Sequence, residues 1–295
     1  MAKSRALKGR IRSIQNTRKI TRTMELVSTS KLKRAQDRVV AARPYAAALA
    51  GVIADLVTPE LMERFPLLRQ PAPVAKGGPR MAAVLLITSN RGLAGGFNSN
   101  LIKEAVKRIA QLEAQGYTIE LHCVGKKGIG YFKYHRRQLA SQRIDIGDKP
   151  TSAHAIELVQ PLIASYEAGK LASVDVVYAK FVSPMSTPAT TVRVLPVSAP
   201  SSQQKSGKQH DYILKPGADE IVAQLLPLYV RNMIYRGLVE TAAGEHGARR
   251  TAMKNATDNA GEILDLLKRT FNRQRQAQIT QEIAEIVGGA AALQG

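Results

Sequence analysis

The spacing of hydrophobic residues changes twice along the chain. From Lys3 to Val57, apolar residues recur mostly three, four or seven positions apart, which is the spacing of one face of an α-helix. At ~1.5 Å per residue such a helix is ~75 Å long, too long to be buried by its own neighbours. From Ala218 onward the pattern is helical again, and no glycine or proline interrupts Glu262 to Val287. We therefore expect a long helix at each end.

The C-terminal helix repeats apolar residues on one expected face, mostly three or four positions apart: Ile263, Leu267, Ile279, Ile283 and Ile286. The simplest packing joins the two terminal helices as an antiparallel coiled coil. Its heptads are imperfect, because polar residues fall on or near the expected seam: Thr21, Ser28, Asn259 and Thr270.

Between the terminal helices, short apolar runs alternate with helical patterns. Residues 58–80 are rich in proline and glycine and mark a boundary. Beyond them, buried-strand patterns are expected at 81–88, 117–124 and 174–182, helices at 101–112 and 153–165, and an edge strand at 190–197. This alternation predicts an inserted small α/β domain with a mainly parallel sheet.

Four segments follow from these patterns. The expected division is an N-terminal coiled-coil helix at 1–58, a linker at 59–80, an α/β domain at 81–210 and a C-terminal coiled-coil helix at 211–295. Within the last helix, Gly244 to Gly247 reads as a weak point. Residues 201–209 are polar, which predicts a mobile segment.

The net positive charge of the chain favours a negatively charged partner. The chain has 43 basic and 23 acidic residues, a net charge of +20, and 13 of the basic residues lie in the first 45 positions against only two acidic ones. Such a field attracts an acidic protein, a nucleic acid or a membrane surface. A nucleic-acid-binding protein is the alternative from another class. It is disfavoured because the first aromatic residue is Tyr45 and no helix-turn-helix or zinc-finger spacing is present.

Candidate chemistry is sparse. The loop Gly92 to Gly96 follows a strand and precedes a helix, as phosphate-binding loops do, but it lacks the Walker and dinucleotide spacings. A tight turn capped by Asn98 explains it better. The five histidines show no ligand spacing, and the single Cys123 excludes an internal disulfide and a cysteine-rich metal site. We expect no active site, no cofactor and no metal.

Three blocks resemble a known family. They are Ile14 to Lys31, Ser89 to Asn98, and the C-terminal block from Met253 to Ala290, which contains Arg275-Gln276-Ala277-Gln278-Ile279-Thr280. Together and in this order they resemble the gamma subunit of bacterial F-type ATP synthase, the central-stalk rotor. The middle domain lacks the cysteine pair that plastid relatives use for redox control.

The resemblance implies a non-catalytic rotor that couples a proton-driven membrane ring to conformational change in a catalytic ring during ATP synthesis or hydrolysis. Its implied partners are the alpha and beta subunits of that ring, the epsilon subunit and the membrane c subunits. The implied partner contacts are the positions that match the family's charged and coupling residues: Lys19, Arg22, Met24, Lys31, Arg34, Arg91, Arg275, Gln276 and Thr280.

The cellular location follows from the same resemblance. It implies a peripheral protein on the cytoplasmic face of the bacterial inner membrane. The first 24 residues are basic and lack acids, as in a mitochondrial presequence, but the helical pattern continues past Met24 without a break, which favours a mature or bacterial chain. No run approaches ~20 uninterrupted apolar residues, so no membrane span is expected.

Overall fold

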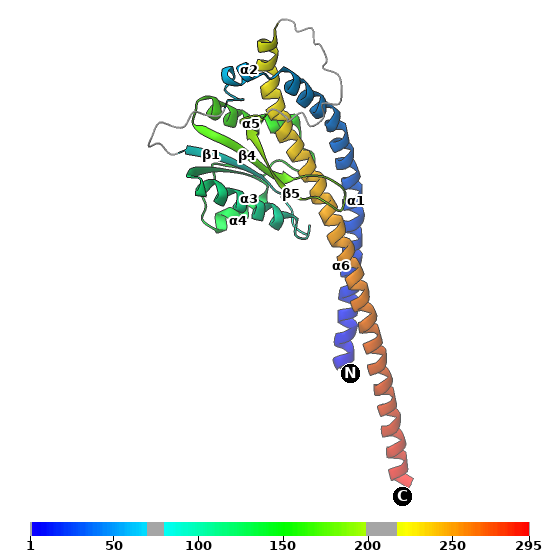
Figure 1. Ribbon diagram of the computed structural model, residues 1–295. Coiled ribbons are helices and arrows are strands. Elements are labelled where there is room, and N and C mark those ends of the chain that lie inside the picture. The colour runs from blue at the N-terminus through cyan, green and yellow to red at the C-terminus, as the bar shows by residue number, and fades with distance from the viewer. Residues whose placement is uncertain (1, 70–79, 199–216, 295) are drawn as a thin grey trace. The chain divides into compact units, whose positions relative to one another are not determined.

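The computed structural model describes residues 2–69, 80–198 and 217–294, in two compact units (Figure 1). Unit 1 comprises Met1–Ser28 and Arg250–Gly295, and unit 2 comprises Thr29–Arg249. Two long helices, α1 (Ala2–Leu56) and α6 (Ala218–Gln294), contribute to both units and confirm the expected terminal helices. The polar segment 201–209 and part of the expected linker lie outside the described residues. The four-segment division of the chain stays a prediction.

Unit 1 is an antiparallel pair of helix segments, seen as the blue and orange-red ends in Figure 1. The Thr257 hydroxyl donates to the Thr21 hydroxyl oxygen at 2.8 Å. A Cβ added at Gly261 would lie 3.6 Å from the guanidinium carbon of Arg18. A later residue of α6 therefore lies opposite an earlier residue of α1, which confirms the antiparallel pairing.

The buried face of α6 in unit 1 differs from the expected one. Its buried residues are Met253, Thr257, Ala260 and Leu264, at the four-three-four spacing of a coiled-coil seam. By contrast, Ile263 is 47% exposed. The apolar stripe expected from the sequence was wrong in this stretch, because the small Thr and Ala side chains form the seam and leave Ile263 and Leu266 outside it. Farther along α6, Ile279, Ile283 and Ile286 are exposed as well.

Unit 2 contains one mixed sheet of five strands in the order β3-β2-β1-β4-β5. Four strands run parallel and β5 is an antiparallel edge strand, so the expected mainly parallel sheet is confirmed. The strand bounds are β1 (Arg80–Ile87), β2 (Tyr117–Val124), β3 (Ser141–Arg143), β4 (Leu171–Ala179) and β5 (Ala189–Leu195).

Helices cover both faces of the sheet. Because successive residues of a strand point to opposite faces, alternate residues of β1 enter two separate apolar cores. One core packs α3 (Phe97–Ala114) and α4 (Lys126–Tyr134) on the sheet, and the other packs α5 (Ser152–Glu167) and α6. A third cluster packs Leu32, Ala35 and Val39 of α1 against Phe181, Val239 and Ala243.

Some elements were missed or misread in the sequence. The expected linker contains the short helix α2 (Pro59–Arg64), and both α4 and β3 went unrecognised. The expected weak point at Gly244 to Gly247 was also wrong, because α6 continues through it. A Cβ at Gly244 would lie 3.0 Å from the Phe97 ring, and one at Gly247 would lie 2.8 Å from the Pro184 carbonyl oxygen. These glycines permit close packing.

One stretch of α1 is apolar enough on average to be a candidate membrane span, although the sequence contains no run of ~20 uninterrupted apolar residues. Within Arg5–Leu56, an 18-residue window reaches a mean hydropathy of 1.4, apolar enough by length and composition to cross a membrane. Only 22% of that window is buried, although Leu49, Ile53 and Leu56 are, and one helix of this kind is weak evidence for a membrane span. Composition alone therefore does not establish a span.

Candidate functional site

Helix α6 occupies the edge of the sheet where ligands of open α/β folds usually bind. That position lies beyond the carboxyl ends of the strands where strand order reverses, here between β1 and β4. The Thr241 hydroxyl accepts a hydrogen bond from the Ala179 amide at 3.2 Å, and the Glu240 carboxylate accepts one from the Phe181 amide at 2.9 Å. The end of β4 is therefore bonded to α6 side chains.

Side chains fix the start of the Gly-rich loop after β1 and the start of α4. Asn98 Oδ1 accepts from the Ser89 amide at 3.0 Å, while α3 begins after Gly96 without a side-chain cap. Asn98 therefore fixes the start of the loop and does not cap the helix. In α4, the Lys126 amide donates to Asn90 Oδ1 and the Gly128 amide to Thr88 Oγ1, both at 3.0 Å. These three amides are therefore already bonded and are not free to bind a phosphate.

Gly125, between β2 and α4, has a purely steric role. Gly125 has φ +96°, and a Cβ there would lie 2.2 Å from the Thr88 carbonyl oxygen. Only glycine allows the ends of β1 and β2 to approach this closely.

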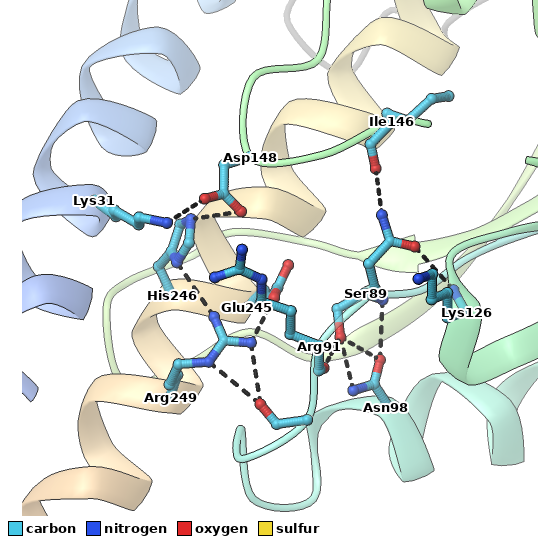
Figure 2. Close-up of polar contacts among 12 residues, drawn as sticks. Lys31, Ser89, Arg91, Asn98, Lys126, Ile146, Asp148, Glu245, His246 and Arg249 are labelled. Carbon is cyan, nitrogen blue, oxygen red and sulfur yellow. Dashed lines mark hydrogen bonds and ion pairs between the residues drawn. The ribbon is translucent and has the colours of Figure 1, made fainter. Parts of the chain in front are cut away.

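Arg249 joins α6 to the Gly-rich loop through a buried polar cluster (Figure 2). Its guanidinium donates to the Glu245 carboxylate at 2.5 Å and to the Gly92 carbonyl oxygen at 3.2 Å. Both charged side chains are almost fully buried. Burial raises the pKa of Glu245, and the hydrogen bond from Arg249 opposes that rise.

His246 lies in the same cluster with 2% of its surface exposed. Arg249 Nη1 is 3.5 Å from its Nδ1, and because arginine can only donate, Nδ1 is the acceptor and the proton belongs on Nε2. Nε2 faces Asp148 Oδ1 at 3.6 Å. Burial lowers the pKa of His246 to about 4, although Asp148 opposes the shift.

Lys31, one of the predicted partner contacts, has an internal partner. Its Nζ lies 2.5 Å from Asp148 Oδ2, and Arg38 donates to the Asp148 backbone carbonyl at 2.9 Å. Burial pushes the pKa of Asp148 upward, but the hydrogen bond from Lys31 and the charge of Arg91 help to hold it below its ordinary value. Asp148 is therefore ionised at neutral pH.

Arg91, Asp148 and Glu245 border a polar cavity of about 550 Å³ beyond the ends of β1, β2 and β3. Its charged lining is mixed: Arg91, Lys126 and Lys149 against Asp145, Asp148 and Glu245. Cations next to acids make a poor site for a small anion. Among the residues described, no group of three or more His, Cys, Asp or Glu is placed to hold a metal ion.

The structure brings together two of the three predicted contacts in unit 2. Lys31 and Arg91 both act on the Asp148 charge. Arg34 is exposed on α1, with no hydrogen bond or ion pair within the described part of the chain.

Three predicted contacts lie on the α1 segment of unit 1. Lys19 and Arg22 are exposed, and Arg22 forms an i,i+3 ion pair with Glu25 at 3.0 Å. Met24 is half-buried.

The remaining predicted contacts lie near the end of α6. Arg275, Gln276 and Thr280 are all exposed, and the Thr280 hydroxyl donates to the Gln276 backbone carbonyl at 3.0 Å. In Figure 1 the last turns of α6 extend past the described end of α1. Those turns expose large apolar side chains: Ile279, Ile283, Ile286 and Val287.

The buried cluster was missed at the sequence level. Glu245 and Arg249 are four residues apart on a helix, which favours an ion pair and offered a usable signal. Asp148 follows a three-residue strand that was not recognised, so nothing local connected it with Lys31.

Comparisons with known proteins all point to one family. A family model described as ATP synthase matches residues 3–293. The ATP synthase gamma chain of Gemmatimonas aurantiaca is 61% identical over 295 residues, covering 100% of both chains. That of Leptospira biflexa is 40% identical, covering 99% of this chain and 100% of its own.

Among solved structures, the fold is similar to a chain of the Euglena gracilis mitochondrial ATP synthase, in an assembly described as OSCP/F1/c-ring in rotational state 3. The TM-score is 0.67 at 17% identity, covering 99% of this chain and 95% of that one. A chain of the Tetrahymena thermophila mitochondrial ATP synthase central stalk and c-ring gives a TM-score of 0.55 at 23% identity, covering 80% and 99%.

Proposed function

This chain belongs to the family of ATP synthase gamma chains, and on that premise we propose that it turns within a ring of alpha and beta subunits and couples rotation to their conformational change. A gamma chain is the central-stalk rotor of the complex and a non-catalytic subunit of it. The observation that carries the proposal is the end of α6, where a helix without an α1 partner exposes Ile279, Ile283, Ile286 and Val287.

Exposed apolar side chains on an unaccompanied helix favour a protein partner that encloses it. We assign that role to the cavity of the alpha and beta ring. Arg275, Gln276 and Thr280 lie on the same turns and supply polar contacts to the surrounding wall. The α/β domain then lies outside the ring with the epsilon subunit and the membrane c subunits, at the cytoplasmic face of the bacterial inner membrane.

Coupling requires the rotor to favour a different conformation of each catalytic subunit at each angle. Moving a two-state subunit from 1:99 to 99:1 takes ~5.5 kcal/mol of differential interaction. An exposed ion pair contributes only ~0.2–1 kcal/mol, so several charges must act together with packing contacts. In this proposal Lys19, Arg22, Lys31, Arg34 and Arg91 meet acidic loops, and Met24 packs beside them.

Neutralising three of these cations together tests the assignment. Lys31→Gln, Arg34→Gln and Arg91→Gln are preferred to glutamates, because a glutamate at position 31 would face Asp148. We expect normal assembly and fewer protons pumped per ATP hydrolysed. A control variant with the exposed Lys103, Lys107 and Lys133 changed to Gln carries the same change in net charge. Equal pumping in the two variants would contradict the assignment.

Co-purification tests the wider proposal. Extraction in mild detergent should yield the chain with alpha and beta subunits and bound nucleotide. Recovery with nucleic acid and without these subunits would instead support the nucleic-acid-binding alternative.

A further inference from the structure

The Lys31–Asp148 ion pair joins parts of the chain that are far apart in sequence. Lys31 belongs to α1, and Asp148 belongs to the loop between β3 and α5, 117 residues later. The two side chains point toward one another in Figure 2. Lys31 Nζ lies 2.5 Å from Asp148 Oδ2. Arg38, two turns along α1, donates to the backbone carbonyl of Asp148 at 2.9 Å. The loop is therefore held against α1 by two separate contacts.

Asp148 has other positive or polar neighbours besides Lys31. Its second carboxylate oxygen faces Nε2 of the neutral His246 ring at 3.6 Å, and the charge of Arg91 stabilises its ionised form. The contact from Arg38 involves the backbone and does not depend on the carboxylate. If Lys31 moves away, Asp148 keeps these neighbours and the loop keeps its attachment.

The exposure of the pair is intermediate among the ion pairs of unit 2. The side chains of Lys31 and Asp148 are 36% and 34% exposed. Lys33 and Asp37 on the same helix are 75% and 61% exposed, whereas Asp175 is fully buried at 0% between two arginines. A fully buried pair cannot exchange partners without leaving a buried charge unpaired. A half-exposed pair is weak enough to exchange and still ordered enough to hold a lysine in place.

We propose that Asp148 is an internal competitor for Lys31: it occupies the lysine between partner contacts and is displaced when a carboxylate of the partner's acidic loop reaches it. This inference rests on the proposed function, in which Lys31 meets that loop. Lys31 then exchanges one carboxylate for another and is never left without a carboxylate partner. When the partner moves on, Asp148 takes the lysine back, so the contact breaks as readily as it forms.

Acylation of the full-length chain tests the pair without any partner. Rates of acetylation at Lys31 and Lys33 by sulfosuccinimidyl acetate are measured by mass spectrometry in the wild type, in Asp148→Asn and in Asp37→Asn. The asparagine at 148 should speed acetylation of Lys31 by up to about fivefold, the factor expected for a half-exposed pair, and leave Lys33 unchanged. Asp37→Asn should speed acetylation of Lys33 and leave the rate at Lys31 unchanged. An unchanged Lys31 rate in Asp148→Asn would overturn the proposal.

Folding is checked by the near-ultraviolet circular dichroism of the tyrosines. If Asp148→Asn loses that spectrum, Asp148→Ser removes the carboxylate with a smaller polar side chain and is read in the same way. Asp148→Glu keeps a carboxylate, so Lys31 should stay protected in it. Fast acetylation of Lys31 in the glutamate variant would contradict a role for the charge.

The assembled complex tests the exchange itself. Without Asp148 nothing reclaims Lys31, so the lysine should release its partner slowly. At low ionic strength, Asp148→Asn should hydrolyse ATP up to about fivefold more slowly than the wild type, and the two should converge as salt screens the contact. Parallel salt profiles would overturn the exchange, since a purely structural defect would not respond to salt. Because the acetylation assay involves no partner, failure of the rotor proposal would leave its result intact.

Discussion

Acidification should destabilise unit 2 through His246. The pKa of this histidine is about 4 in the folded chain against 6.5 ordinarily, because the ring is buried beside Arg249. A depressed pKa means that the unfolded chain takes up the proton first. The stabilising contribution is therefore complete above pH ~6.5 and is lost as pH falls toward ~4. At ~1.4 kcal/mol per pKa unit, the loss is about 3 kcal/mol.

The variant His246→Gln isolates this effect. Glutamine is uncharged, and its amide can donate toward Asp148 and accept from Arg249. The wild-type pH profile by itself does not isolate His246, because Glu245 also contributes. The raised pKa of Glu245 favours the folded state as pH falls, which is opposite in sign to the effect of His246. The difference between the wild type and the variant removes that contribution. We expect the stability advantage of the wild type to shrink by about 3 kcal/mol between pH 7 and pH 4.

Urea unfolding followed by near-ultraviolet circular dichroism is the suitable assay. The chain has no tryptophan, and all nine tyrosines lie between positions 45 and 235, within unit 2. The signal therefore reports unit 2 without a contribution from unit 1 tyrosines. His135→Gln, which changes an exposed histidine, should leave the pH profile as in the wild type. If the profiles of the wild type and His246→Gln run parallel, the linkage argument is wrong.

Three further outcomes are expected. The purified chain should show no saturable ATP binding by calorimetry, because the loop from Gly92 to Gly96 lacks the Walker and dinucleotide spacings; micromolar binding would contradict this. Replacing Arg275 and Gln276 with alanine should slow ATP hydrolysis by the reconstituted complex without unfolding the chain, since each partner group left buried and unpaired costs ~1–3 kcal/mol; normal turnover would refute the contact. Gly244→Ala should destabilise unit 2 by about 1 kcal/mol, because the new methyl group would lie 3.0 Å from Phe97. Gly130 has no atom within 4 Å of an added Cβ, so Gly130→Ala should stabilise unit 2 in the same urea assay.

The strands were predictable where their burial is complete. The run Met81 to Ile87 is apolar because both faces of β1 are covered, and this can be read locally. The strand β3 has three residues and a polar sequence, and it exists because Ser141 to Arg143 pair with β2. No local pattern predicts such a strand.

The coiled-coil seam was harder to predict because both hydrophobic spacing and the close packing of small side chains decide which residues of the helix are buried. Hydrophobic spacing favoured Ile263, which the structure leaves half-exposed, and overlooked Thr257 and Ala260, whose small side chains allow close packing. Apolar residues on the end of α6 stay exposed in the described part of the chain. Periodicity identifies apolar faces but does not say whether the chain or a partner buries them.

The sequence identified which residues are candidate partner contacts, but it did not show which of them already have a partner within the chain. The resemblance identified Lys31 and Arg91, yet it could not indicate that Lys31 is already paired with Asp148. That pairing depends on the tertiary fold, which brings two loops and two helices to one edge of the sheet.

Direct observation of rotation tests the central claim. Cys123 is 1% exposed and burial raises the pKa of its thiol to about 12, so a cysteine introduced at the exposed position Lys107 can be labelled selectively. The complex is immobilised through its catalytic ring, and a gold bead is attached at position 107. A rotor predicts that the bead turns in one direction while ATP is hydrolysed and stops when ATP is withdrawn. A bead that keeps a fixed angle while the immobilised complexes hydrolyse ATP would contradict the account.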